Sequence, residues 1–183
     1  EFSEGRGKLR IVFKNDVLVG ELGAEESIWH MMVSSKLNSC TISIPNPLGD
    51  SDSINLSVKL ARNTKNNVAL INGTPYISSD IKISAQIKSA TQASTSGNSN
   101  YYSKENIKLI EDSCNEYLKK TINDYLYKTA KEYNCDIDSF GKYAVKYFTT
   151  IQDWQDYNWL DNFQNSTFNV NVETTIKSGN TFL

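Results

Sequence analysis

Histidine, cysteine and proline are scarce in this chain of 183 residues, which contains one, three and three of them. With His30 as the only imidazole, and no cysteines at zinc-ligand spacing, we expect no metal site and no cofactor. No apolar run approaches the roughly 20 residues that a membrane-spanning helix needs. The chain also lacks a large excess of either charge, because 19 basic and 21 acidic residues leave a net charge of −2. We therefore expect no nucleic-acid partner.

The residues that are present are typical of a folded domain. Hydrophobic residues make up 39% of the chain, aromatic residues 11% and charged residues 22%. Aromatic and β-branched residues are too frequent for a predominantly disordered chain. We expect residues 1–183 to form a single soluble domain taken from a longer protein, because the opening Glu1-Phe2-Ser3 includes neither a start methionine nor a signal peptide.

The three cysteines are isolated along the chain. Cys114 and Cys135 lie 21 positions apart on what reads as one helical stretch, which would separate them by about 30 Å. A disulfide requires Cα atoms within about 7 Å. We expect these two cysteines and Cys40 to be thiols that pack as small hydrophobic residues.

Alternating apolar residues predict strands along much of the chain. A hairpin is expected over residues 8–22, and further strands over 40–44, 54–60, 68–71, 81–87 and 168–176. Asn72-Gly73 is a strong signal for a chain reversal. From residue 89 to residue 100 the composition falls to small polar residues, and we expect a mobile loop over about 89–102.

Two segments have helical periodicity. Residues 24–35 are predicted to turn Ile28, Met31, Met32 and Ser35 toward the core, and residues 104–133 repeat apolar side chains every three or four positions. A helix of that length would span about 45 Å, so a bend or break is expected in it. The predicted fold class is α+β, with an antiparallel-rich (mixed) β-sheet covered on one face by the long α-helix and shorter helices.

Acidic residues are the candidates for catalysis. They occur as Asp136 with Asp138, and as a group of three, Asp153, Asp156 and Asp161. A glycosidase requires two carboxyl groups facing each other across a cleft. His30, in the middle of a helix, is expected to be a packed or surface residue. A hydrolase therefore remains the less favoured alternative, and no catalytic, cofactor-binding or metal-binding residue is assigned.

An aromatic cluster over residues 143–163 is the candidate for ligand binding. Its members are Tyr143, Tyr147, Phe148, Trp154, Tyr157, Trp159 and Phe163. Their helical spacing favours packing within the core, with Trp154, Trp159 and Phe163 as its anchors. The alternative is a small-molecule or cortex-sugar binding module that stacks its ligand on these rings.

Motifs at both ends of the chain point to one family. Residues 12–22 read VFKNDVLVGEL, and Asp138-Ser139-Phe140-Gly141 is followed by Trp154, Trp159, Phe163 and the strand that ends near Gly179. In order and spacing they resemble the C-terminal domain of the Ger(x)C family, the C subunits of spore germinant receptors. Tyr143 replaces the second glycine of the family loop, and no proline precedes Trp154.

The resemblance implies a non-catalytic lipoprotein subunit that acts in nutrient-triggered spore germination through protein–protein interaction. It implies the A and B subunits of the receptor as partners. It also implies a location on the outer face of the spore inner membrane, through a lipid anchor outside this chain. The lipoprotein signal and the N-terminal domains of the family would lie upstream, and we expect the isolated domain to be monomeric.

Overall fold

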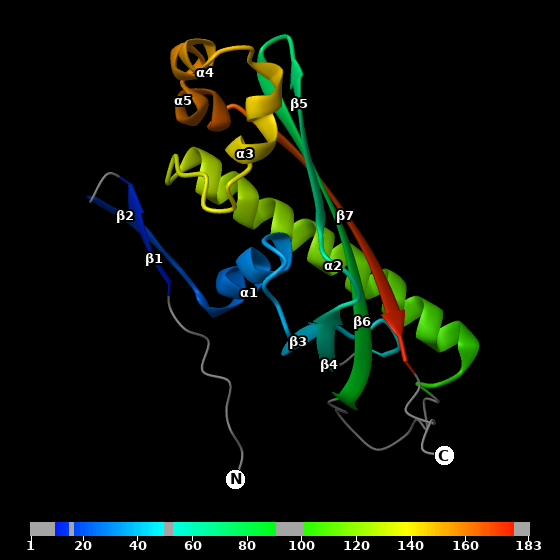
Figure 1. Ribbon diagram of the computed structural model, residues 1–183. Helices are drawn as coiled ribbons and strands as arrows, with labels where there is room; N and C mark the ends of the chain where they lie inside the picture. Colours follow the sequence, from blue (N-terminus) through cyan, green and yellow to red (C-terminus); the bar gives the residue numbers. More distant parts are fainter. Residues whose placement is uncertain (1–9, 15–16, 50–52, 91–100, 178–183) are drawn as a thin grey trace.

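A mixed β-sheet and one long helix dominate the computed structural model, which describes residues 10–14, 17–49, 53–90 and 101–177 (Figure 1). The α+β fold class is confirmed. The strands are β1 (Arg10–Lys14), β2 (Val17–Leu22), β3 (Cys40–Pro45), β4 (Ser53–Leu60), β5 (Lys65–Ile71), β6 (Thr74–Ala90) and β7 (Thr167–Ile176). The helices are α1 (Ala24–Val33), α2 (Lys104–Lys131), α3 (Gly141–Ala144), the 3₁₀ turn η1 (Val145–Tyr147), α4 (Ile151–Tyr157) and α5 (Trp159–Phe163).

The main sheet is organised around β6, its longest strand. Residues 74–80 of β6 pair with β5 and residues 83–90 pair with β4, both antiparallel, and β3 pairs with β4. On its other edge, residues 76–85 of β6 pair with β7 in parallel. Since β7 overlaps both antiparallel regions, β4 and β5 must lie end to end along the same edge of β6. The predicted antiparallel-rich, mixed sheet is therefore confirmed.

The hairpin between β5 and β6 explains the Asn72-Gly73 signal. Both residues have positive φ angles, 51° and 79°, and Ile71 pairs with Thr74 across the turn. Left-handed conformations at both central positions define the two-residue turn that matches the twist of a hairpin. The predicted reversal is confirmed.

One face of the main sheet is buried and the other is polar. Along β7 every second residue is buried, as the alternating sequence predicts. The buried face consists of apolar side chains from all five strands: Ile42, Ile44, Ile54, Leu56, Val58, Val68, Ile77, Ile81, Ile83, Ala85, Phe168, Val170, Val172 and Ile176. Helix α2 contributes a matching stripe, including Ile110, Cys114, Leu118 and Ile122. Helix α2 covers only one side of the sheet. The opposite face therefore remains open to solvent, and it carries serine, asparagine and lysine.

Helix α2 begins at a capped end and continues without interruption. The Ser103 hydroxyl accepts a hydrogen bond from the Asn106 amide, which satisfies one of the free donors in the first turn. The 28 residues form one continuous helix, so the expected break is not found between Lys104 and Lys131.

The prediction for helix α1 was partly wrong about its buried side. Met32 is buried as expected, but Trp29 and Val33 are the other buried apolar residues, whereas Ile28 and Met31 are only partly buried. The buried side also includes His30, which contacts Asp138 from 108 positions further along the chain. The prediction used only the spacing of apolar residues and gave no weight to His30, whose partner Asp138 is remote in the sequence. It therefore placed the buried side of the helix on the neighbouring residues.

Side chains of α2 cap the outer edge of β7. The backbone amide of Ile176 donates to Glu111 Oε1 at 2.8 Å, that of Thr174 to Asn115 Oδ1 at 2.8 Å, and that of Phe168 to the Tyr127 hydroxyl at 3.4 Å. Four residues of an α-helix rise about 6.0 Å, and two residues of a strand rise about 6.6 Å. Acceptor side chains four positions apart on α2 therefore lie opposite backbone amides two positions apart on β7. An edge strand otherwise exposes unpaired amides.

Replacing Asn115 with alanine is expected to lower the free energy of unfolding by about 1–3 kcal/mol, because the part-buried Thr174 amide loses its acceptor. Asn115→Asp keeps an acceptor and should cost less. Glu116→Ala changes the exposed neighbour on the same helix and is the matched control. Urea unfolding measures all three, and equal effects of Asn115→Ala and Glu116→Ala would contradict the capping role.

All three cysteines are thiols, as expected. Cys114 is buried and Cys40 is partly buried, and burial raises the pKa of both thiols to about 11. Only the thiolate reacts with alkylating agents. At pH 8 in the native state we therefore expect iodoacetamide to leave Cys114 unmodified, and to modify it once urea unfolds the chain. Mass spectrometry of the digested protein measures this, and rapid native labelling of Cys114 would contradict its burial.

The predicted hairpin is found as β1 and β2, which pair antiparallel in a separate two-stranded sheet and contact Tyr133, just after the end of α2. Its Gly20 packs against the Tyr133 ring so closely that an added Cβ would lie 2.3 Å from a ring carbon. The Tyr133 hydroxyl donates to the Glu21 carbonyl at 2.9 Å. A glycine is required at this position because no larger residue leaves room for the ring.

The first two residues of the loop expected over residues 89–102 belong to a strand. Strand β6 continues through Ala90 and pairs with β4 up to that residue. Residues 91–100 lie outside the described residues, so the predicted mobility is not addressed there. None of the helices in the described part of the chain combines the length and the apolar character of a transmembrane segment.

Candidate functional site

The aromatic cluster lies in α3, η1, α4 and α5, which gather near the β5–β6 hairpin at one end of the molecule (Figure 1). Two tyrosine hydroxyls attach these helices to the hairpin. Tyr157 donates to the Gly73 carbonyl at 2.7 Å, and Tyr147 donates to the Val68 carbonyl at 2.9 Å. The cluster is therefore fixed to the sheet.

The rings of the cluster pack against one another. Trp154 and Trp159 stack with ring centroids 5.8 Å apart, and Trp154 also stacks on Tyr157 at 6.4 Å. Phe148 contacts Trp154 and Tyr157 at 5.3 and 4.8 Å. Much of the ring area that a sugar platform would present to its ligand is thus in contact with other rings.

Burial within the cluster increases toward the sheet. Trp159 and Phe163 are buried, and Phe163 packs on Phe168 of β7 at 5.9 Å. Both are core anchors, as predicted. Trp154 is only half-buried, so the prediction for this residue is correct in part. Its position at the boundary follows from the short helix α4, which has no fully buried residue.

Asp136 organises the start of this region. Its carboxylate accepts hydrogen bonds from the amides of Phe140 and Gly141, at 2.8 and 2.7 Å, and from the indole of Trp159 at 2.9 Å. Burial raises the pKa of Asp136, and these three donors act against that shift. A Cβ added to Gly141 would lie 3.0 Å from the indole nitrogen of Trp159, which explains the glycine of the Phe140-Gly141 motif.

Asp138 faces a different set of partners. One carboxylate oxygen lies 2.9 Å from His30 Nδ1, and the other accepts a hydrogen bond from the Tyr125 hydroxyl at 2.9 Å. All three side chains are buried. Burial and the neighbouring Asp138 carboxylate raise the pKa of Tyr125, which keeps its hydroxyl protonated as a donor. This network joins α1, α2 and the loop before α3.

The remaining acidic candidates have local structural roles. Asp153 forms the capping box of α4 with Thr150. Asp156 accepts from Gln152 at 2.7 Å, and Asp161 accepts from Asn158. All three are exposed on the surface. In the part of the chain that the structure describes, no three histidine, cysteine or acidic residues are grouped as a metal site would require.

Three exposed apolar side chains in η1 and at the start of α4, here called the exposed patch, were not predicted from the sequence. They are Val145, Ile151 and the cluster member Tyr147, of which Ile151 is 78% exposed. Ile151 is the first residue of α4 and is followed by Gln152 and Asp153 before Trp154. An isoleucine in the first turn of a short helix was the available signal. Exposed apolar patches mark interaction surfaces.

Comparisons with known proteins are consistent with the described fold. The family model for "Spore germination B3/GerAC like, C-terminal" matches residues 11–179. The crystal structure of the GerBC protein matches with a TM-score of 0.69 and 16% identity, over 89% of this chain and 48% of that chain. That similarity establishes the fold only, and the chain spans about half the length of the GerBC chain. A search of the curated proteins found no match.

Proposed function

The chain belongs to the family of spore germination B3/GerAC-like C-terminal domains, and from this membership we propose that it is the interaction domain of a germinant receptor subunit. Its role in spore germination would be to bind the other subunits of the receptor, without catalysis of its own. The partners that we propose are the A and B subunits. The location that we propose is the outer face of the spore inner membrane, through a lipid anchor outside residues 1–183.

The observation that carries this proposal is the exposed patch of Val145, Tyr147 and Ile151. Tyr147 and Ile151 are 47% and 78% exposed, and in the sequence they lie on either side of Phe148, whose ring packs against Trp154. The patch therefore lies on a well-supported surface, and aromatic and aliphatic residues of this kind are typical of interface centres. The acidic candidates, by contrast, are engaged in helix capping and buried hydrogen bonds, which supports a binding role over hydrolysis.

Photocrosslinking in the full-length protein, co-expressed with its receptor partners, tests the proposal. A photoreactive phenylalanine analogue at Ile151 should crosslink to the A or B subunit. The same analogue at Lys120, exposed on α2, is the matched control and should not. Crosslinks from Lys120 but not from Ile151 would place the interface elsewhere.

An Ile151→Asp variant adds a functional measurement. Because Ile151 is exposed, the variant should unfold at the same temperature as the parent. It should nevertheless lose co-purification with the partner subunits and slow germination in response to nutrients. Normal co-purification and germination would show that the patch does not contact the partners.

A further inference from the structure

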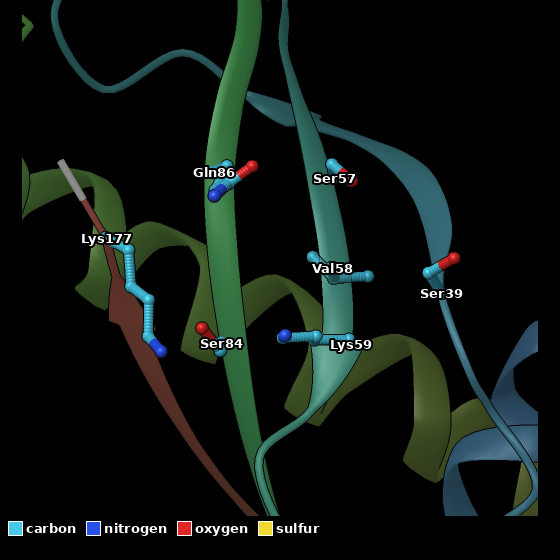
Figure 2. Close-up of a pocket in the computed structure, with 7 residues that line it drawn as sticks. All are labelled: Ser39, Ser57, Val58, Lys59, Ser84, Gln86 and Lys177. Carbon is cyan, nitrogen blue, oxygen red and sulfur yellow. The ribbon is translucent and has the colours of Figure 1, made fainter. Parts of the chain in front are cut away.

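A hollow on the polar face of the sheet brings two lysines together. It has a volume of about 120 Å³ and is lined by Ser39, Ser57, Val58, Lys59, Ser84, Gln86 and Lys177. These residues come from β4, β6 and the segments that precede β3 and follow β7, at the end of the sheet away from the aromatic cluster (Figure 1). Lys59 and Lys177 extend toward Ser84 from the two sides of β6 (Figure 2).

The strand register explains why these residues meet. Lys59 is paired with Ser84, and Ser57 with Gln86, across β4 and β6. The Lys177 amide donates to the Ala85 carbonyl, which places Lys177 beside Gln86 on the other edge of β6. Side chains of alternate residues share one face of a sheet, so the two lysines lie diagonally across Ser84 and Gln86.

Ser84 forms the floor of the hollow. It is only 7% exposed, although it lies on the open face of the sheet, between the buried Ile83 and Ala85 of the opposite face. A hydroxyl at this depth can donate one hydrogen bond to a group above it. The hollow therefore combines two cationic side chains at its sides with neutral donors at its base.

The surrounding charges leave the hollow positive. Glu173, on the same face, forms an ion pair with Lys82. Its pKa is lowered mainly by Lys82 and to a smaller extent by Arg62. Neither Lys59 nor Lys177 forms an ion pair with any residue in the described ranges. Two ammonium groups that share a small hollow repel each other, and an anion placed between them removes that repulsion.

We propose that this hollow binds one small anionic group, a free phosphate or carboxylate, between the ammonium groups of Lys59 and Lys177 and above the hydroxyl of Ser84. The hollow has room for one group of this size. The site lies on the opposite side of the sheet from α2 and is separate from the proposed interaction patch.

Inorganic phosphate is the probe for the test, added to the ¹⁵N-labelled protein while amide chemical shifts are recorded. Shifts should concentrate on Ser84, Gln86 and Lys177 and decrease as sodium chloride is added. Lys59→Gln and Lys177→Gln should each weaken binding at least fivefold. Lys120→Gln, the same change on the exposed side of α2, is the matched control and should bind phosphate as the parent does. Unchanged melting temperatures establish that the variants are folded.

Three results would overturn the proposal. The first is a set of small shifts spread evenly over the protein, and the second is equal phosphate affinity in Lys59→Gln, Lys177→Gln and the control. The third comes from a parallel measurement with phosphatidylglycerol vesicles: binding to vesicles without binding of free phosphate would assign the lysines to a lipid headgroup. Localised shifts that both variants abolish would establish the free-anion site.

Discussion

Replacing Asp138 with alanine is expected to lower the free energy of unfolding by about 4 kcal/mol. The change leaves His30 Nδ1 and the Tyr125 hydroxyl buried without their acceptor, and each such group costs about 1–3 kcal/mol. Solvent cannot replace the lost partner easily, because all three residues are at most 5% exposed. The network connects three segments, so the loss should affect the cooperative unfolding of the whole fold.

Two further variants isolate the contribution of the network. Tyr125→Phe removes the hydrogen bond to Asp138, together with the 3.5 Å contact of the same hydroxyl with His30 Nδ1, and should cost about 1 kcal/mol. Asp156→Ala removes an exposed carboxylate of the same type and should change stability by less than about 0.5 kcal/mol. Denaturant midpoints measure all three, and an Asp138→Ala variant as stable as Asp156→Ala would show that the network contributes nothing.

Trp159→Ala is expected to have a comparable effect, a loss of about 3–5 kcal/mol, because the buried ring packs between Phe163 and Gly141. It also removes one of the three donors to Asp136. Trp154→Ala, at the half-buried end of the same stack, should cost clearly less. Thermal unfolding monitored by circular dichroism measures both.

A carbohydrate assay distinguishes packing from ligand recognition at these rings. If Trp159 is a core anchor, Trp159→Ala lowers stability and the parent protein binds no cortex sugar. If the variant instead unfolds like the parent but loses binding to a sugar that the parent binds, the cluster is a binding platform.

The elements that could be predicted from the sequence are those whose pattern is local. The alternation of β7, the apolar stripe of α2 and the Asn72-Gly73 turn each depend on neighbouring residues, and all three are found in the structure. Trp159 and Phe163 were identified as core for the same reason. The aromatic cluster could therefore be located before its geometry was known.

The features that could not be predicted depend on pairs that are distant in the sequence. His30 is buried because Asp138 contacts it, and helical periodicity carries no information about that contact. The diagonal approach of Lys59 and Lys177 follows from the register of β6 with two other strands. Register across a parallel pair is set by packing and not by a turn, so the sequence gives no local signal for it.

The acceptors along α2 and the amides along the edge of β7 repeat at slightly different intervals. From Glu111 to Tyr127 the helix advances about 24 Å, and from Ile176 to Phe168 the strand advances about 26 Å. The mismatch accumulates along the contact, and the bond at Phe168 is the longest, at 3.4 Å, and uses the long side chain of tyrosine. Insertion of one residue in α2 or in β7 would move the acceptors and amides beyond the insertion out of alignment. These two segments should therefore accept substitutions during evolution while keeping their lengths fixed.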